Sequence, residues 1–97
     1  MPAAVLNGHL STGHSCFPPT PVSASASKTS INGILVALNQ DKYASHSCGV
    51  TTHPDDARPG ISGAAKTSIE GKPPLRIGDS IGCGDACGQG SENTFIE

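Results

Sequence analysis

The sequence contains no Trp and is poor in large apolar side chains of every kind. Val, Leu, Ile and Phe together number eighteen, and much of the hydrophobic fraction of 35% consists of Ala. A chain of this size and composition buries little apolar surface when it folds. Because the formal net charge is only -2, charge repulsion would not keep the chain unfolded. We therefore expect an additional source of stability, which can be disulfides, a metal ion or a partner surface.

Three further absences narrow the function. Lys and Arg number only 6 and form no basic run, which argues against binding to nucleic acid. No apolar run approaches the roughly 20 residues that span a bilayer. The first ten residues lack the cationic and apolar regions of a secretory signal. We therefore expect synthesis and folding in a reducing cytoplasm, where 4 Cys and 4 His indicate metal ligands before disulfides.

The local signals that are present indicate β structure. The sequence has 12 Gly and 8 Pro, so long helices are not expected. The short run from Ile34 to Leu38 is apolar and partly β-branched, which predicts a strand. Asn32-Gly33 and Glu70-Gly71 each follow a Thr-Ser-Ile triplet and predict turns between strands. The Pro-rich stretch 17–27 resembles a linker and suits an extended path around a surface.

Internal repetition is the strongest signal in the sequence. The segment KTSIN recurs as KTSIE and, more loosely, as NTFIE at the end of the chain. In each copy the Thr and Ile positions are separated by one residue, which is the period of a strand. The repetition therefore predicts three equivalent strand segments, at residues 29–31, 67–69 and 94–96.

A second series of three interleaves with the first. Each turn-like triplet, NGH, NQD or IGD, is followed four or five residues later by a potential metal ligand: His14, His46 and Cys83. Three strand copies and three ligand-bearing turns imply pseudo-threefold symmetry within one chain. His9 aligns with the two aspartates of this series, so we interpret it as a turn residue and not as a ligand.

The second series predicts a metal site. A structural zinc site takes about four imidazole or thiolate ligands in a tetrahedron. If the three modules surround an axis, His14, His46 and Cys83 converge on it near one end. His53, seven residues after His46, is the best candidate for the fourth ligand. The predicted site is therefore one structural zinc ion held by three His and one Cys, with iron as an alternative metal. A closed set of four protein ligands leaves no position for catalysis.

Other uses of the four cysteines stay open at this stage. Cys83-x3-Cys87, His14-x-Cys16 and His46-x-Cys48 offer rival ligand sets, and an all-thiolate site is chemically reasonable. Cys16 and Cys48 can instead form a disulfide if the protein reaches an oxidising space. For Cys48 and Cys87 we favour an interpretation as small buried side chains.

Several short motifs, taken in their order, resemble a known family. They are the opening MPAA, the spacing from Gly8 to His14, Gly78-Asp79 followed by Cys83-Gly84, Gly90-Ser91, and above all the segment GKPPLRIGD at 71–79. In this order they resemble the PAAR-repeat proteins, and the resemblance covers almost the whole chain. We therefore expect residues 1–97 to form a single PAAR-repeat domain. His9 and Gln40 depart from the pattern, because a Gly-Asp turn is expected there.

The resemblance implies a fold and a site. It implies an all-β fold, a small cone of short strands and hairpins with internal pseudo-threefold repeats, stapled by one zinc ion near the tip. The ligands that carry over are His14, His46, His53 and Cys83. The base of the cone is expected to bind the blunt end of a trimeric β-helical spike, with one copy per trimer.

The expected function is mechanical, without turnover of a substrate. The chain would cap and sharpen the central spike of a contractile injection machine and would help to pierce the host outer membrane during transient contact. The sequence shows no cargo domain, which favours a phage tail baseplate, with the protein made in the host cytoplasm and located at the spike tip of the virion.

Three alternatives stay open. The first is a type VI secretion tip that recruits effectors. The second is a small disulfide-bonded secreted binding protein. The third is a metal-dependent hydrolase that uses His14, His46, Asp55 and Asp56, although two acidic residues on a Pro-bounded surface loop are common without any such role.

Overall fold

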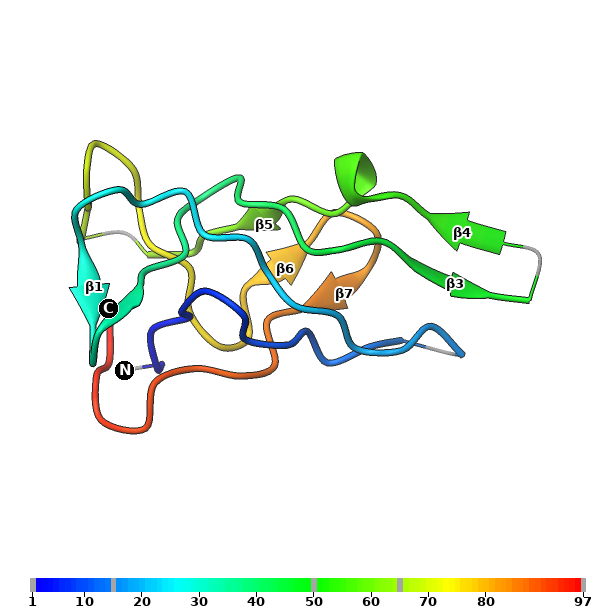
Figure 1. The fold of residues 1–97 in the computed structure, drawn as a ribbon, viewed down its shortest axis with the longest axis horizontal. Coiled ribbons are helices and arrows are strands. Elements are labelled where there is room, and N and C mark those ends of the chain that lie inside the picture. The colour runs from blue at the N-terminus through cyan, green and yellow to red at the C-terminus, as the bar shows by residue number, and fades with distance from the viewer. Residues whose placement is uncertain (1, 15, 50, 65, 97) are drawn as a thin grey trace.

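The computed structural model describes residues 2–14, 16–49, 51–64 and 66–96. Its strands are short and antiparallel, and they form two hairpins and one three-stranded sheet (Figure 1). The elements in chain order are β1 (Ser30–Ile31), β2 (Ile34–Leu35), β3 (His46–Cys48), β4 (Thr51–His53), a 3-10 turn η1 (Asp55–Ala57), β5 (Gly60–Ile61), β6 (Ser80–Ile81) and β7 (Asp85–Ala86). The predicted all-β fold is confirmed. No helix in the described ranges could cross a membrane.

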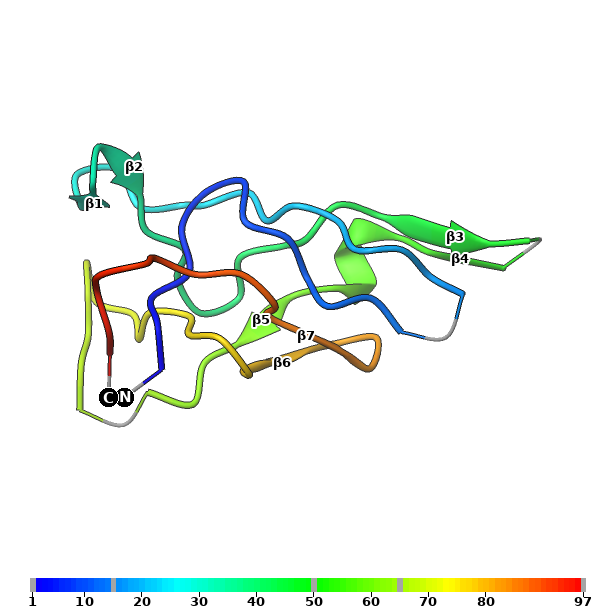
Figure 2. The ribbon, with the colours of Figure 1, turned by 90° about the horizontal axis from the view of Figure 1, so that it is seen from below.

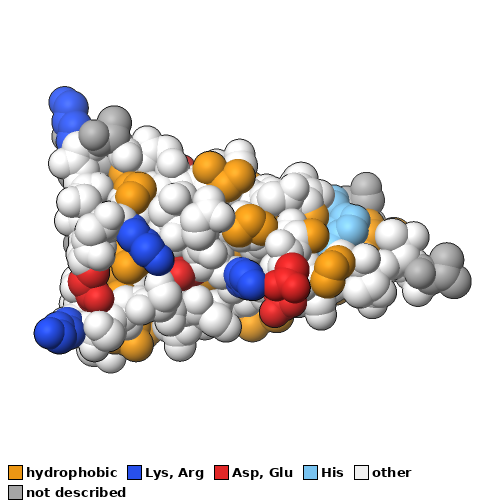
Figure 3. Space-filling model, turned by 90° about the horizontal axis from the view of Figure 1, so that it is seen from above, with side chains coloured by type: hydrophobic (Ala, Val, Ile, Leu, Met, Phe, Trp, Pro, Cys, Tyr) orange, Lys and Arg blue, Asp and Glu red, His pale blue; other side chains and the backbone are white. Residues whose placement is uncertain are grey.

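The molecule tapers from a wide end to a narrow end, and its principal extents are 38 × 24 × 22 Å (Figure 3). β1, β2 and both chain ends lie at the wide end, and the β3–β4 hairpin reaches the narrow end (Figures 1 and 2). The β6–β7 hairpin ends short of the β3–β4 hairpin in both views. The predicted cone shape is therefore present, and its narrow end is asymmetric.

A closed ring of backbone hydrogen bonds reveals the pseudo-threefold axis. The N–H of Val5 donates to the carbonyl of Leu75 at 3.0 Å, Leu75 donates to Ala37 at 3.0 Å, and Ala37 donates to Val5 at 2.9 Å. The side chains of all three residues are completely buried. Each segment therefore plays the same part toward the next, as three identical chains would around a true threefold axis.

Three turns follow the ring and direct the chain toward the narrow end. Gly8, Gln40 and Gly78 occupy equivalent positions with φ values of 86°, 75° and 91°. Glycine adopts this left-handed region without steric cost. Gln40 is one of three non-glycine residues in the described ranges that also adopt it. Three hairpins follow these turns. We name them hairpin I (residues 9–22), hairpin II (residues 41–60) and hairpin III (residues 79–87), and each begins with a backbone pairing between its two ends.

Two of the turns are closed by an aspartate. Asp41 Oδ2 accepts the N–H of Leu38 at 2.6 Å, and Asp79 Oδ2 accepts the N–H of Arg76 at 2.8 Å. Both aspartates are buried, and each satisfies a backbone donor within its turn. The predicted equivalence of these turns is therefore visible in their hydrogen bonds.

The predicted strand copies at the wide end differ from one another. The first copy forms β1, which pairs with β2 through the Asn32-Gly33 turn. The copies at 67–69 and 94–96 form single bridges, Ile69 with Lys72 and Phe95 with Ala3. The Glu70-Gly71 turn has positive φ values within 3° of those of Asn32-Gly33, so both turns are as predicted.

Proline explains one of these differences. The carbonyls of Thr29 and Thr94 accept the N–H groups of Val36 and Ala4. The position equivalent to Val36 and Ala4 in the third segment of the ring is Pro74, which has no N–H to donate to Thr67. The strand copy at 67–69 therefore lacks the backbone hydrogen bond that the copies at 29–31 and 94–96 form through their Thr carbonyls.

The apolar core is small and lies along the axis. One cluster consists of Val5, Val22, Ala37, Tyr43, Leu75, Ile81 and Cys87. A second consists of Leu6, Ala26, Val36 and Leu38. Small side chains thus fill part of both clusters, as the composition indicated. The Pro-rich stretch is not a linker, because Pro21 pairs with Leu10 and Val22 pairs with Tyr43 in the return arm of hairpin I.

Candidate metal centre

Side chains from all three hairpins meet near the narrow end. His14 lies at the tip of hairpin I, where its backbone pairs with Phe17. His46 and His53 lie opposite each other on β3 and β4. Cys83 lies in the turn that joins β6 to β7. The structure thus brings together all four residues that the sequence analysis selected, although they lie on three separate hairpins.

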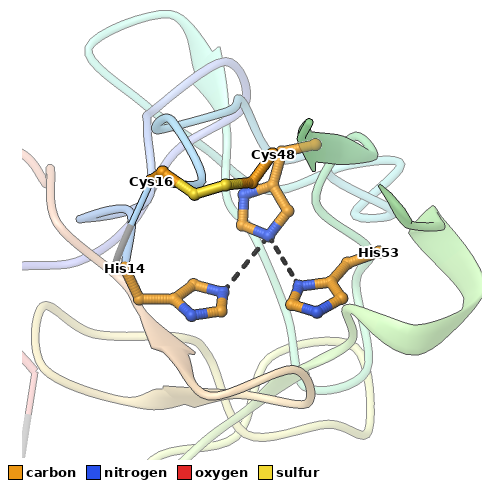
Figure 4. Close-up of a disulfide and its surroundings, with 5 residues drawn as sticks. His14, Cys16, Cys48 and His53 are labelled. Carbon is orange, nitrogen blue, oxygen red and sulfur yellow. Dashed lines mark hydrogen bonds between the residues drawn. A yellow bond between two sulfur atoms is a disulfide. The ribbon is translucent and has the colours of Figure 1, made fainter. Parts of the chain in front are cut away.

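The potential ligand atoms of these residues lie within 4.8 Å of one another. His46 Nε2 is central. It lies 3.3 Å from His14 Nε2, 3.1 Å from His53 Nδ1 and 3.6 Å from Cys83 Sγ. Cys83 Sγ also lies 3.6 Å from His14 Nε2. Figure 4 shows the three imidazole rings directed toward one point.

The four shortest of these separations fit a tetrahedral metal ion. With zinc bonds of about 2.0 Å to nitrogen and about 2.3 Å to sulfur, the edges of a tetrahedron are about 3.3 Å between nitrogens and about 3.6 Å from nitrogen to sulfur. The separations from His46 to its neighbours are close to these lengths. The donor set also fits, because imidazole and thiolate are the ligands of structural zinc sites.

The hydrogen bond from His46 to the backbone defines its tautomer. His46 Nδ1 lies 2.9 Å from the carbonyl oxygen of Pro18. A carbonyl oxygen only accepts hydrogen bonds, so Nδ1 carries the proton and the neutral ring leaves a lone pair on Nε2. A backbone carbonyl on the far nitrogen is a frequent partner of a histidine ligand. The Pro-rich arm of hairpin I thus orients a ligand of hairpin II.

The surroundings of His53 favour the neutral form that a metal ligand needs. Desolvation lowers the pKa of His53, and electrostatic interactions with the neighbouring His14, His46 and Arg58 lower it further. A neutral imidazole has a lone pair on one of its two nitrogens, and Nδ1 is the nitrogen of His53 that faces His46.

Phe17 covers the histidines and was not singled out from the sequence. Its ring stacks on His53 with 4.0 Å between centroids and on His14 with 5.0 Å between centroids. It also lies 4.7 Å from the ring of His46. An apolar ring on three imidazoles limits the access of water to the cluster. Nothing in the spacing of a lone Phe within a Pro-rich stretch indicates this role.

A disulfide between Cys16 and Cys48 joins hairpins I and II beside the cluster (Figure 4). The interpretation of Cys48 as a small buried side chain is therefore wrong, and Cys16 and Cys48 are not available to an all-thiolate site. The expectation that the cysteines would serve as metal ligands before disulfides is also wrong for this pair. The Cα atoms lie 5.5 Å apart, within the range that a disulfide spans.

Cys87 behaves as the sequence analysis expected. It is buried in the core, and desolvation raises its pKa to about 11. A thiol with such a pKa stays protonated at neutral pH and is a poor ligand and nucleophile. Of the two cysteines outside the disulfide, only Cys83 thus faces the cluster.

A buried arginine adjoins the cluster, and this residue was also missed. Arg58 is completely buried and pairs with Asp85, whose side chain is equally inaccessible, at 3.3 Å. Burial opposes ionisation of Asp85, but hydrogen bonds from Ser11, Thr12 and Arg58 outweigh it and lower the pKa of this carboxyl. A single Arg near η1 carries no signal in the sequence that distinguishes it from an exposed one.

Comparison with known families gives the class of the protein. A sequence model described as the PAAR motif matches residues 12–89, which contain all four cluster residues. The chain therefore belongs to the PAAR motif family. No match to an individual curated protein was found.

The family defines the general role. PAAR proteins form and sharpen the tips of trimeric spikes in injection machines, which include phage tails and the type VI secretion system. They are structural proteins and not enzymes. The cluster of three His and one Cys is consistent with a structural metal ion.

Proposed function

We propose that this chain caps the blunt end of a trimeric β-helical spike, with one copy per trimer, and that a zinc ion fixes its apex. The observation that carries this proposal is the closed ring of hydrogen bonds through Val5, Ala37 and Leu75. It arranges one chain around an axis of the same order as the partner, so that one copy can offer three similar contacts.

The wide end has the chemistry of such a contact. β2 lies there, and its residues Ile34 and Leu35 are 41% and 38% exposed. Phe95 is 50% exposed and pairs with Ala3 near the two chain ends. The end of a trimeric β-helix presents open strand edges and an apolar interior, which both need a cover. Apolar side chains on the base of the cone would supply part of it.

Zinc would act as a structural element at the apex. His14, His46, His53 and Cys83 would hold the ion, which supplies four bonds that join the three hairpins. Structural zinc contributes on the order of 10 kcal/mol to the folding of small domains. This contribution would offset the small core. Four protein ligands leave no position for a reacting water, so the ion has no catalytic role in this proposal.

The narrow end would then transmit force. The disulfide and the metal cluster lie within the hairpins that form it, and both restrict their relative motion. A narrow and stiff tip applies the force of contraction to a small area of the host outer membrane. We propose a contractile phage tail as the machine, with the tip in the virion, and a type VI secretion tip that recruits effectors as the alternative. Mass spectrometry of purified particles from the source strain distinguishes the two.

The stoichiometry with the spike tests the central claim. The purified chain is mixed with a trimeric spike protein from the same source, and the mass of the complex is measured by light scattering. We expect one chain per trimer, and three chains per trimer would contradict the proposal. Phe95→Glu should weaken the complex. The matched control is Ile61→Glu, because Ile61 is 48% exposed on β5, in the middle of the cone. If Phe95→Glu and Ile61→Glu weaken the complex equally, the spike does not bind at the wide end.

A further inference from the structure

Arg58 is the most deeply buried cation of the described chain, and it uses all parts of its guanidinium. Nε donates to the carbonyl of Ala44 at 2.9 Å. Nη2 donates to Thr20 Oγ1 at 2.6 Å and to Asp85 Oδ2 at 3.3 Å. Nη1 donates to Cys83 Sγ at 2.8 Å. A buried charge is tolerated only when its donors are paired in this way.

The partners of Arg58 come from all three hairpins. Thr20 belongs to hairpin I, Ala44 to hairpin II, and Cys83 and Asp85 to hairpin III. A buried ion pair by itself contributes little net stability, since desolvation of both charges offsets their attraction. The position of Arg58 between the core and the cluster therefore calls for an explanation beyond the ion pair.

The contact with Cys83 is the specific feature. Cys83 lies in a turn between Gly82 and Gly84, and neither neighbour has a side chain that could hold the turn in place. A Cβ atom on Gly82 would lie 2.7 Å from the carbonyl oxygen of Ala57. The turn therefore packs directly against the residue before Arg58, and this close approach places the Cys83 sulfur on Nη1.

Nη1 also contacts His46 Nε2 at 2.8 Å, so one nitrogen with two N–H bonds reaches two of the four cluster residues. We propose that Arg58 is the positioning residue of the metal centre, which holds the Cys83 thiolate by an N–H···S hydrogen bond from the core side. This inference rests on the proposed metal site. A bound metal would take the lone pair of His46 Nε2, and Nη1 would then be left with its contact to Cys83.

The expected consequence is a change in metal affinity. Residues that hydrogen-bond a metal ligand typically contribute 10–100-fold to affinity. Arg58 fixes the one anionic ligand, and its positive charge lies next to the thiolate. Loss of the guanidinium should therefore weaken zinc binding by about 10–100-fold and change the electronic environment of the sulfur.

The test compares two arginine–aspartate pairs in the full chain. Arg58→Met with Asp85→Asn removes the buried pair without leaving one charge alone. Arg76→Met with Asp79→Asn is the matched control, because Arg76 and Asp79 form a pair at 3.2 Å at the opposite end of hairpin III from Cys83. Zinc affinity is measured by competition with a chelator, and the thiolate-to-cobalt charge-transfer band is recorded on the Co²⁺-loaded proteins.

We expect weaker zinc binding and a shifted charge-transfer band in the Arg58 variant only. Equal affinity and an unchanged band in both variants would show that Arg58 is merely structural, and the metal site itself would stand. Absence of zinc binding by the unaltered chain would overturn the metal site and this inference together.

A second measurement needs no substitution and remains available if the Arg58 variant fails to fold. The unaltered chain is loaded with ¹¹³Cd²⁺, and NMR is used to detect a coupling between the metal and the Arg58 Nη1 protons through the sulfur. A detectable coupling supports the proposal. Nη1 protons that exchange rapidly with water and show no coupling would overturn it.

Discussion

His9 Nδ1 accepts the backbone N–H of Leu6 at 3.0 Å. This is the bond that a carboxylate oxygen makes in the other two turns, from Asp41 to Leu38 and from Asp79 to Arg76. The interpretation of His9 as a turn residue is thus supported, and an imidazole takes the place of a carboxylate. The substitution has one chemical consequence, because a histidine loses its acceptor when it is protonated.

The first prediction concerns the pH dependence of stability. Burial lowers the pKa of His9 from its ordinary value of 6.5. Below pH 6.5, His9 therefore binds a proton more readily in the unfolded chain than in the folded one. The contribution of this turn to stability is fully present above pH 6.5. It is lost as the pH falls through the lowered pKa of His9. His9→Asp should keep the acceptor ionised and become the more stable protein at about pH 5. Chemical denaturation from about pH 5 to about pH 7 measures the difference.

The difference in stability between the unaltered chain and His9→Asp isolates the titration of His9, because the histidines of the cluster are present in both proteins and their contributions cancel. His9→Asn is the control, because its amide oxygen accepts the Leu6 N–H and does not titrate in this range. It should show the same reduced pH dependence. Parallel curves for the unaltered chain and both variants would refute the role of His9 in this turn.

The second prediction concerns Glu70 at the wide end. Hydrogen bonds from the backbone N–H groups of Ser27 and Lys28 and from the Thr29 hydroxyl lower the pKa of Glu70 to about 2, from 4.5. Its contribution to stability is present above pH 4.5 and is lost as the pH falls through about 2. Glu70→Gln should therefore be destabilised at neutral pH, and the difference from the unaltered chain should shrink between pH 4.5 and 2. Urea denaturation across this pH range measures the difference.

A matched variant separates the carboxylate from the backbone. Glu70 has a φ of 52°, close to the 55° of Asn32 at the equivalent turn position. Asparagine suits this conformation better than glutamate does. Glu70→Asn should still be less stable at neutral pH, since it loses the bonds to the segment that leads into β1. A more stable Glu70→Asn protein would show that the backbone preference outweighs those bonds.

The repeats explain why so much of the fold was predictable. Symmetry converts similar sequence segments into equivalent positions, and this equivalence is enough to predict that His14, His46 and Cys83 lie together. His53 was predictable from its distance to His46 along one hairpin. The lengths of the strands were not predictable, because they depend on partners that are distant in the sequence. Pro74, which has no N–H to donate, stands at the position equivalent to Ala4 and Val36.

The residues around the cluster were harder to predict. Arg58 and Phe17 contact it only in three dimensions, and neither belongs to a repeated segment. The disulfide had a signal, since Cys16 and Cys48 each lie two residues after a histidine of the cluster. A reducing cytoplasm disfavours disulfides, so this symmetry alone was not enough to predict the bond between Cys16 and Cys48.

The third prediction concerns this disulfide. It closes a loop with a sequence separation of 32 residues, and such a cross-link stabilises a fold by about 3–4 kcal/mol through the unfolded state. Reduction with a phosphine, which binds zinc weakly, should lower the Tm by roughly 15 °C or more. Cys16→Ser with Cys48→Ser should have the lower Tm already and should not respond to the phosphine. A thiol assay should show that reduction raises the number of titratable cysteines from two, Cys83 and Cys87, to four. If the Tm of this fully reduced protein is unchanged, the disulfide does not stabilise the fold.

The fourth prediction compares the two cysteines outside the disulfide. Cys83→Ala removes the proposed anionic ligand, so the protein should not retain one zinc per chain after dialysis against a chelator, and its Tm should fall by roughly 20 °C. Cys87→Ala removes a buried sulfur from the core and should lower the Tm by less, because only packing is lost. It should keep its zinc. Metal analysis and thermal unfolding of both variants decide the assignment: zinc retained by Cys83→Ala, or lost by Cys87→Ala, would mean that the apex is not held by the proposed four side chains.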